Sequence, residues 1–295
     1  MVRRRLCGPF IIILSNVLAH NPKPDPRLNA WRDDLAAAHL RGEVDSPQYG
    51  EARHMQVIAP VTALRRTPAD GALQDSQLLF GEDFDVYDVK NGWAWGQARA
   101  DDYVGYMLAE DLASPVQPTH KLAAQRSFIY READIKTRPL CGISFGARLT
   151  VSGMQGRFAA LQDGGFIYAA HLDALEDYET DPIAVARRFI GAPYFWGGRE
   201  ASGLDCSALI QLALTACGYA CPRDSDMQAT ALGRLVDTAK TGDIVFWKGH
   251  VGFISGDNKL LHANAFHMSV VEEDFDAACA RISETDGAVT AIKRL

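Results

Sequence analysis

The chain has 295 residues, which is enough for about two globular domains. Hydrophobic residues make up 47% of it and charged residues 23%, so it can bury ordinary cores and does not have the composition of a disordered chain. The net charge of −7 argues against a nucleic-acid-binding protein, which normally presents a basic face to phosphates. It does not argue against an acidic small ligand, because a local pair of arginines binds a carboxylate whatever the global charge.

The N-terminal end admits two interpretations of where the protein resides. Three arginines precede an apolar run over residues 6–19, which ends in a sequence typical of signal-peptidase sites. The run is short for a membrane span and contains Pro9, Ser15 and Asn16. These features slightly favour a cytoplasmic protein, in which residues 1–19 come from a start misassigned upstream of residues 25–27. Export to the periplasm is expected if residues 1–19 are a signal peptide. No membrane span is expected in the mature domains.

Residues 1–50 form an N-terminal segment, and the spacing of apolar residues over 27–42 predicts a helix in it. Residues 51–115 then show short apolar pieces separated by turn residues, which predicts a small barrel. The expected strands cover residues 57–59, 77–80, 84–89, 93–98 and 103–108.

Residues 118–178 repeat this texture in a degenerate form. Phe80-Gly81 is echoed by Phe145-Gly146, and the pattern around Tyr103 by that around Phe166. Two copies are too few for a solenoid, so two tandem barrels are predicted. Both resemble bacterial SH3-like domains, which hold ligands or complete a neighbouring site.

Residues 180–295 change to helices followed by strands. Asp181-Pro182 is a typical helix start, and a glycine-rich loop leads to a second helix that begins at Cys206 and ends before Gly218. Strands follow from Gly242 onward. Helices first and an antiparallel sheet afterwards indicate an α+β, papain-like fold.

Cys206 is the candidate nucleophile because it lies where a loop becomes a helix. The free amides and the dipole of a helix start favour a thiolate, so a lowered thiol pKa is expected. The same amides lie near the place where an oxyanion would form. The other five cysteines (Cys7, Cys141, Cys217, Cys221 and Cys279) are scattered and are expected to be mostly reduced and inert.

Two histidines on neighbouring predicted strands complete the candidate chemistry. His250 begins one strand and is assigned as the base that takes the thiol proton, and His262 as the group that orients it. A strand histidine taken alone is more often a surface or core residue. The remaining six histidines have no comparable setting.

Several motifs then agree in type, order and spacing with one family. They are 193–198 (PYFWGG), 203–211 (GLDCSALIQ), 222–228 (PRDSDMQ), 242–246 (GDIVF), 249–252 (GHVG) and 261–263 (LHA). This part of the chain resembles the NlpC family of cell-wall cysteine peptidases. With two SH3-like domains ahead of it, the chain resembles the subgroup that hydrolyses the γ-D-glutamyl–diamino acid bond of murein peptides.

The resemblance implies roles for further residues. Tyr194 would line the oxyanion side, Trp196 would shape the pocket, and Ser207 follows the nucleophile as in the family. Asp224 and Ser225 match the pair that holds the free α-amine of an N-terminal L-alanine. Glu82 and Tyr103 are the candidates for the residues with which the first barrel closes the groove. Arg199 and Arg223 either meet substrate carboxylates or, as the more usual case, are solvated surface residues.

The expected function is therefore cysteine peptidase action on murein stem peptides with a free N-terminal alanine, in recycling or turnover of the wall. No cofactor, metal or nucleic acid is expected, and the oligomeric state is left open. A hydrolase of intact peptidoglycan and a related amidase or acyltransferase are the enzymatic alternatives. A binding module that has lost its catalysis would lack part of the Cys-His-His set. A zinc site built on Cys206, Cys217, Cys221 and a histidine rests on weak spacing.

Overall fold

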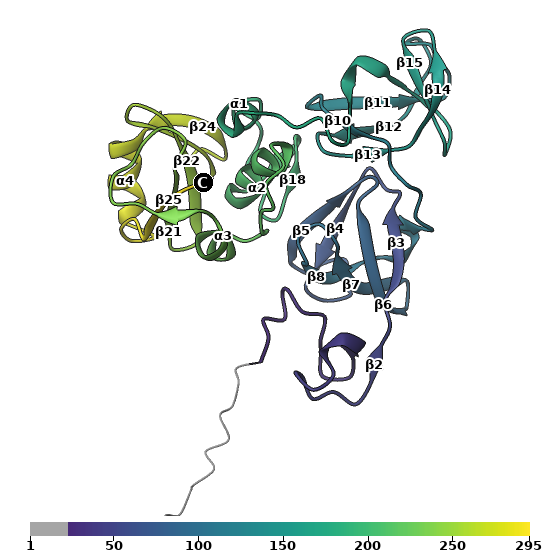
Figure 1. Cartoon of the computed structure of the whole chain (residues 1–295), viewed down its shortest axis with the longest axis horizontal. Helices are drawn as coiled ribbons and strands as arrows, with labels where there is room; N and C mark the ends of the chain where they lie inside the picture. The colour runs from purple at the N-terminus through teal and green to yellow at the C-terminus, as the bar shows by residue number, and fades with distance from the viewer. Residues whose placement is uncertain (1–22) are drawn as a thin grey trace, which may run out of the picture.

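The computed structural model describes residues 23–295, and the predicted signal or extension at residues 1–19 lies outside them. Figure 1 shows two small β units beside a domain of helices and strands that forms the C-terminal part. No helix of the described part is long and apolar enough to span a bilayer. We call the two units, residues 53–113 and 120–174, the first and second β unit, and residues 180–295 the C-terminal domain.

The first β unit is one antiparallel sheet, with strand order β5-β4-β8-β7-β6-β3-β9, closed around an apolar core. Alternate residues of each strand point inward, as with Leu64 and Phe84, which are fully buried. The sequence prediction missed β4, whose pattern is short and carries an arginine at its end, and placed β3 too late in the chain. The strands are β3 (Arg53–Val57), β4 (Val61–Arg65), β5 (Gln74–Leu79), β6 (Asp83–Lys90), β7 (Trp93–Ala98), β8 (Val104–Leu108) and β9 (Leu112–Ala113).

The helix predicted over residues 27–42 is wrong. The structure has instead two short parallel strands, β1 (Ala36–Ala37) and β2 (Tyr49–Gly50), and a 3₁₀ turn at Ala38–Leu40. Ala30, Leu40 and their neighbours pack against Trp95 of the first β unit. Tertiary burial on the sheet, rather than one face of a helix, explains the apolar spacing.

The second β unit consists of a three-stranded and a five-stranded sheet. A 3₁₀ turn at Ala169–His171 follows β16 just as one at Ala109–Asp111 follows β8, in keeping with the repeated sequence texture. The strands are β10 (His120–Leu122), β11 (Arg126–Tyr130), β12 (Pro139–Ser144), β13 (Arg148–Leu149), β14 (Val151–Gln155), β15 (Phe158–Leu161), β16 (Phe166–Tyr168) and β17 (Leu172–Ala174).

The C-terminal domain is a six-stranded antiparallel sheet, order β20-β25-β21-β22-β23-β24, with helices on both faces. Phe246 and Phe253 point toward α2, whereas Val245 and Ile254 point toward α4. Helices α3 and α4 and strand β25 were not predicted. The elements are α1 (Pro182–Arg187), β18 (Arg199–Glu200), β19 (Gly203–Leu204), α2 (Cys206–Ala216), α3 (Ser225–Ala231), β20 (Arg234–Leu235), β21 (Ile244–Trp247), β22 (His250–Gly256), β23 (Lys259–Asn264), β24 (Ser269–Asp274), α4 (Phe275–Ser283) and β25 (Ala291–Arg294).

The first β unit is joined to the C-terminal domain by polar and apolar contacts. Arg199 pairs with Glu82 through two bonds of 2.9 and 3.1 Å, and both side chains are buried. Met227 of α3 belongs to the apolar core of the first β unit. Gly197 lies against β5 with a φ of +71°, and a Cβ on it would come within 2.8 Å of the Gln74 carbonyl oxygen. The glycine-rich loop thus admits the backbone of β5.

Candidate active site

Cys206 is the first residue of α2 and is buried. The residue before it, Asp205, caps the helix, accepting the Ala208 amide at 2.9 Å on Oδ1. Its other oxygen accepts the Gly197 amide at 2.9 Å. The carboxylate therefore fixes both the start of the helix and the glycine-rich loop that precedes the cysteine.

A buried guanidinium holds this carboxylate in place. Arg223 has no exposed surface and donates to both oxygens of Asp205, at 2.9 and 2.7 Å. It also donates to Ser76 of the first β unit and to Ser207, both at 2.9 Å. The expectation of a solvated surface arginine is wrong for Arg223, and equally for Arg199, because each is buried with a carboxylate partner. Their guanidinium groups bind carboxylates within the fold.

Three side chains, from β22, β23 and β24, form a hydrogen-bonded row. His250 Nε2 lies 2.8 Å from His262 Nδ1, and His262 Nε2 lies 2.7 Å from the Glu273 carboxylate. Arg281 binds both oxygens of Glu273, at 2.6 and 2.9 Å. If the carboxylate accepts a proton from His262, then His262 accepts one from His250, and Nδ1 of His250 is left as the basic atom.

The strand that carries His250 lies next to the helix that carries the thiol. β22, which begins at His250, packs against α2, and the amide of Val251 points to the Cys206 sulfur. Burial, followed by the charge of Asp205, raises the pKa of Cys206 to about 12, although the amides of Val251 and Ser207 oppose this. The expected lowering of the thiol pKa by the helix start is therefore wrong, because desolvation outweighs the amides.

The histidines are held neutral by the same burial. It lowers the pKa of His250 to about 3 and that of His262 to about 4, although in the second case the hydrogen bond that His262 donates to Glu273 opposes the shift. Burial opposes ionisation of Glu273, but Arg281 and His262 outweigh it and lower the pKa of this carboxyl to about 2. At neutral pH the site thus holds a neutral thiol, two neutral imidazoles and a carboxylate.

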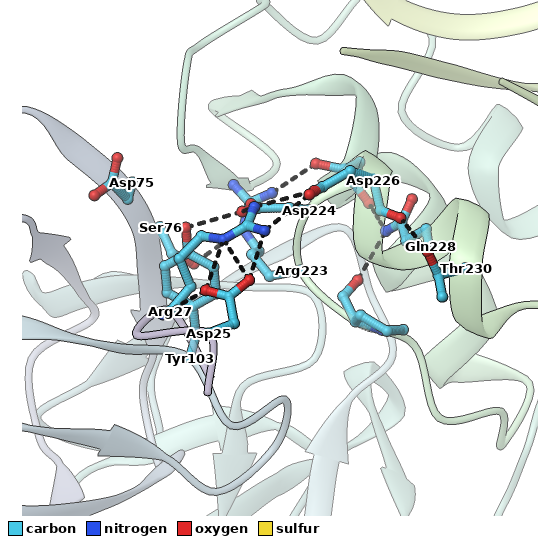
Figure 2. Close-up of polar contacts among 12 residues, drawn as sticks. Asp25, Arg27, Asp75, Ser76, Tyr103, Arg223, Asp224, Asp226, Gln228 and Thr230 are labelled. Carbon is cyan, nitrogen blue, oxygen red and sulfur yellow. Dashed lines mark hydrogen bonds and ion pairs between the residues drawn. The ribbon is translucent and has the colours of Figure 1, made fainter. Parts of the chain in front are cut away.

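A second polar cluster lies where the start of α3 meets the first β unit, close to the beginning of β8 (Figure 2). The hydroxyl of Tyr103 donates to Asp224 Oδ2 at 3.1 Å. Arg27, from the N-terminal segment, donates to the same oxygen at 2.9 Å and to Asp226 at 2.8 Å. Asp25 accepts from Arg27 at 2.7 Å. We call these five residues the amine-end cluster, after the role that the family resemblance implies for Asp224.

The structure brings some of the predicted substrate-binding residues to these clusters and not others. Tyr103 and Asp224 meet, and Ser225 is the next residue. Tyr194 lies near the nucleophile, since burial and then the Cys206 thiol raise the pKa of its hydroxyl.

The remaining predicted substrate residues have other surroundings. Trp196 is 65% exposed on the loop before α2. The Ser207 hydroxyl is buried and donates to Asp205 at 3.1 Å. Glu82 is not in the amine-end cluster: its carboxylate binds Arg199 and the Leu79 amide. Burial opposes ionisation of Glu82, but Arg199 outweighs it and lowers its pKa. The choice of Glu82 as a groove residue is therefore wrong.

Sequence reasoning missed Glu273, Arg27 and Asp75. Asp75 of β5 lies beside the amine-end cluster, and its charge contributes to raising the pKa of Tyr103, after burial and Asp224. Alternation along β24 could have indicated that Glu273 shares a side of the sheet with His262. No sequence signal indicates that Arg27 binds Asp224, because 197 positions separate the two residues in the chain.

The cysteine expectations can be examined in the described part of the chain. Cys141, Cys206, Cys217, Cys221 and Cys279 are all free thiols. Within residues 23–295 no three His, Cys, Asp or Glu side chains gather in a way that could hold a metal ion. The zinc-site alternative built on Cys206, Cys217 and Cys221 therefore has no support from the geometry.

Comparison with known proteins agrees with this arrangement. The family model described as the bacterial dipeptidyl-peptidase Sh3 domain matches residues 64–112, and that of the NlpC/P60 family matches residues 191–281. A γ-D-glutamyl-L-lysine dipeptidyl-peptidase of Bacillus subtilis is 31% identical over 222 residues, which span 66% of this chain and 73% of that protein. Dipeptidyl-peptidase 6 of Lysinibacillus sphaericus is 29% identical over 235 residues, spanning 70% of this chain and 86% of that protein.

A crystal structure of an NlpC/P60 family protein from Bacillus cereus superposes with a TM-score of 0.69 at 18% identity. The match covers 82% of this chain and 99% of that one, and it shows the shared fold. The papain-like C-terminal domain and the SH3 domain ahead of it are thereby confirmed. With its SH3 domain, its helix-start cysteine and its paired histidines, the chain belongs to the NlpC/P60 family of cysteine peptidases.

Proposed function

We propose that this peptidase cleaves the γ-D-glutamyl–diamino acid bond of murein peptides whose N-terminal L-alanine has a free amine. Its place would be in recycling or turnover of wall peptides. Two relatives are named γ-D-glutamyl-L-lysine dipeptidyl-peptidases, at 31% and 26% identity. The proposal includes an SH3-like nature for the second β unit as well as the first.

The contact between Tyr103 and Asp224 is the observation that carries the substrate assignment. It pairs an SH3-domain hydroxyl with a peptidase-domain carboxylate, 3.1 Å apart. Asp224 stands at the N-cap of α3 yet makes no capping bond, so its carboxylate is directed to the SH3 domain instead of its own helix. A partly buried carboxylate of this kind suits an ammonium group, which supplies charged hydrogen bonds that an acylated nitrogen lacks.

In the proposed mechanism the thiol is neutral until the substrate is bound. Nδ1 of His250 takes the proton as Cys206 Sγ attacks the γ-carbonyl carbon of D-glutamate. The tetrahedral oxyanion faces the first amides of α2 and the hydroxyl of Tyr194. His262 and Glu273 stabilise the imidazolium that forms, because the hydrogen-bonded row ends on a carboxylate of low pKa.

The imidazolium then gives its proton to the amine of the leaving diamino acid as the carbon–nitrogen bond breaks. This step leaves a thioester between Cys206 and the γ-carboxyl of the alanyl-glutamate product. A water molecule that loses a proton to His250 attacks the thioester, and the thiol is released with the proton restored. The residues act without any cofactor in this scheme.

The test uses defined peptides. L-Ala-γ-D-Glu-L-Lys, its diaminopimelate counterpart and the N-acetylated form of each are incubated with the enzyme, with Cys206→Ala as the control for background hydrolysis. Mass spectrometry should detect the L-Ala-D-Glu dipeptide from the free-amine peptides, with at least about tenfold slower release from the acetylated ones, because a charged hydrogen bond contributes about 1.5–3 kcal/mol. Equal cleavage of both forms, or release only from intact wall, would contradict the proposal.

A further inference from the structure

Arg27 connects the N-terminal segment to the peptidase domain at the amine-end cluster. Its guanidinium donates to Asp224 at 2.9 Å and to both oxygens of Asp226, at 3.1 and 2.8 Å. Asp25 fixes the other side through bonds from the backbone amide, at 2.9 Å, and from the side chain. This planar group is therefore held in one orientation by three carboxylates (Figure 2).

The Arg27 side chain is more exposed than the Asp224 side chain to which it binds. The Asp224 side chain is 24% exposed, whereas that of Arg27 is 38% exposed and that of Asp226 is 62% exposed. Arg27 and Tyr103 bind the same oxygen of Asp224, Oδ2. Among the residues that the structure describes, none hydrogen-bonds the other oxygen, Oδ1. A small cation arriving at Asp224 thus has an oxygen to bind without displacing Arg27.

The charge of the cluster remains favourable for a cation. Three carboxylates (Asp25, Asp224 and Asp226) and one guanidinium give a net charge of 1 − 3 = −2. The carboxylates of the cluster therefore oppose the repulsion between Arg27 and an ammonium group. What Arg27 removes is space beyond Asp224, rather than affinity for a positive charge at it.

We propose that Arg27 is a specificity-determining residue that closes the groove beyond the α-amine of the substrate. The inference rests on the proposed function, because it assumes that the amine binds at Asp224. A peptide that ends in a free amine stops at Asp224 Oδ1. An acyl group or a further residue on that nitrogen must enter the volume of the guanidinium, and it can do so only by breaking the charged hydrogen bonds to three carboxylates. Arg27 thereby makes the enzyme selective for peptides whose N-terminal amine is free.

The experiment measures kcat/KM for L-Ala-γ-D-Glu-L-Lys and for its N-acetyl and N-glycyl derivatives. Arg27→Ala should raise the ratio of extended to free-amine cleavage by at least about tenfold, since a single charged contact at a site of recognition changes binding by about that factor. Arg27→Lys keeps the positive charge but not the planar guanidinium with its several donors, and it should give an intermediate ratio. Arg27→Gln serves if the alanine variant does not fold, as judged by thermal unfolding of the whole chain.

Arg32→Ala is the matched control. Arg32 anchors the same N-terminal segment, pairing with Asp88 and stacking 4.5 Å from the centre of the Trp95 ring, but makes no contact with Asp224. The selectivity ratio should be unchanged in this variant. Equal relaxation in Arg32→Ala, an unchanged ratio in Arg27→Ala, or an equal loss on all peptides would overturn the assignment of Arg27. A wild-type enzyme that does not cleave the free-amine peptide would instead refute the proposed function on which the inference rests.

Discussion

The hydroxyl of Tyr103 and the carboxylate of Asp224 meet at 3.1 Å although 121 positions separate them in the chain. One residue belongs to the SH3 domain and the other begins α3 of the peptidase domain. The proposed recognition surface is thus assembled from two domains, whereas Cys206 and the histidine row come from one. Substrate selection and bond cleavage can therefore be altered by different sets of substitutions.

Loss of the Tyr103 hydroxyl should weaken recognition of the amine and leave the chemistry intact. In Tyr103→Phe we expect KM for the free-amine peptide to rise about 3- to 30-fold with little change in kcat, because one hydrogen bond to a charged group is lost. Tyr106→Phe is the control, since the Tyr106 hydroxyl meets Arg32 and not Asp224. A fall in kcat with constant KM would argue that Tyr103 acts on the reaction itself.

Cys206 should be the residue whose thiol catalysis requires. We expect Cys206→Ala and Cys206→Ser to abolish peptide hydrolysis. Cys279→Ser and Cys141→Ser, which change half-buried thiols, should retain it. Hydrolysis is followed by release of the dipeptide, and alkylation is mapped by mass spectrometry. Loss of activity that follows labelling of any other cysteine would contradict this assignment.

Glu273 should act as a positioning residue through His262. Because the carboxylate stabilises a positive imidazole row, Glu273→Gln should lower kcat about tenfold or more with KM nearly unchanged. Glu272→Gln is a close control: the neighbouring carboxylate points to Arg187 and Ser255 instead. The pH profile of kcat distinguishes the charge effect from a packing effect, because a packing defect would not shift it.

The low pKa values of the histidines predict activity on the acid side. With a pKa of about 3, His250 stays neutral and can accept a proton at pH 5.5. The enzyme should therefore keep more than half of its maximal kcat/KM at pH 5.5, where a histidine of ordinary pKa would leave about one tenth in the basic form. Measurement of kcat/KM between pH 4.5 and 8 tests this, and an acid limb centred at 6.5 would be evidence against it.

Stability should follow the same groups with a definite sign. The unfolded chain protonates His250 and His262 near pH 6.5, while the folded chain does so only near 3 and 4. Between these values the unfolded state binds more protons, so the free energy of unfolding falls as the pH is lowered from about 6.5. Urea unfolding at pH 7 and pH 5 should show a smaller drop for His250→Gln than for wild type. His39→Gln, at an exposed position, should show the wild-type drop.

The pair of Glu82 and Arg199 should contribute to stability and not to selectivity. Glu82→Gln leaves a buried guanidinium without its counter-charge, which typically costs about 3–5 kcal/mol in the free energy of unfolding. The double change Glu82→Leu with Arg199→Met should recover much of that loss. The ratio of free-amine to acetylated cleavage should stay at the wild-type value in every variant that folds. A changed ratio would be evidence that Glu82 takes part in substrate selection in the groove.

The positions of the three candidate catalytic residues in the fold could be predicted because local sequence determines them. The start of α2 at Cys206 and the strand positions of His250 and His262 follow from caps, glycines and alternation, which act over a few residues. The family and the peptidase class, both confirmed, rest on those same short motifs. The assignment of the three residues to their roles stays a prediction.

What failed depends on contacts between distant segments. The apolar spacing over residues 27–42 fits a helix, yet burial on Trp95 determines the conformation. Glu82 and Asp75 are both acidic residues of the SH3 domain. Only the position of Arg199, which forms a buried ion pair with Glu82, shows that Glu82 is the one with a structural partner. The pKa of Cys206 likewise depends on burial by segments that the local motif does not contain.

The packing of Met227 bears on what counts as a module in this protein. By chain order Met227 belongs to the peptidase domain, but by packing it belongs to the SH3 core. Three residues before it stands Asp224, so the position of that carboxylate is inherited from a domain other than its own. A chimera that joins this peptidase domain to a foreign SH3 domain would keep the thiol and the histidine row. It would lose the contacts that fix the position of α3. Recombination within such proteins should therefore succeed only where the SH3 domain and α3 of the peptidase domain are exchanged together.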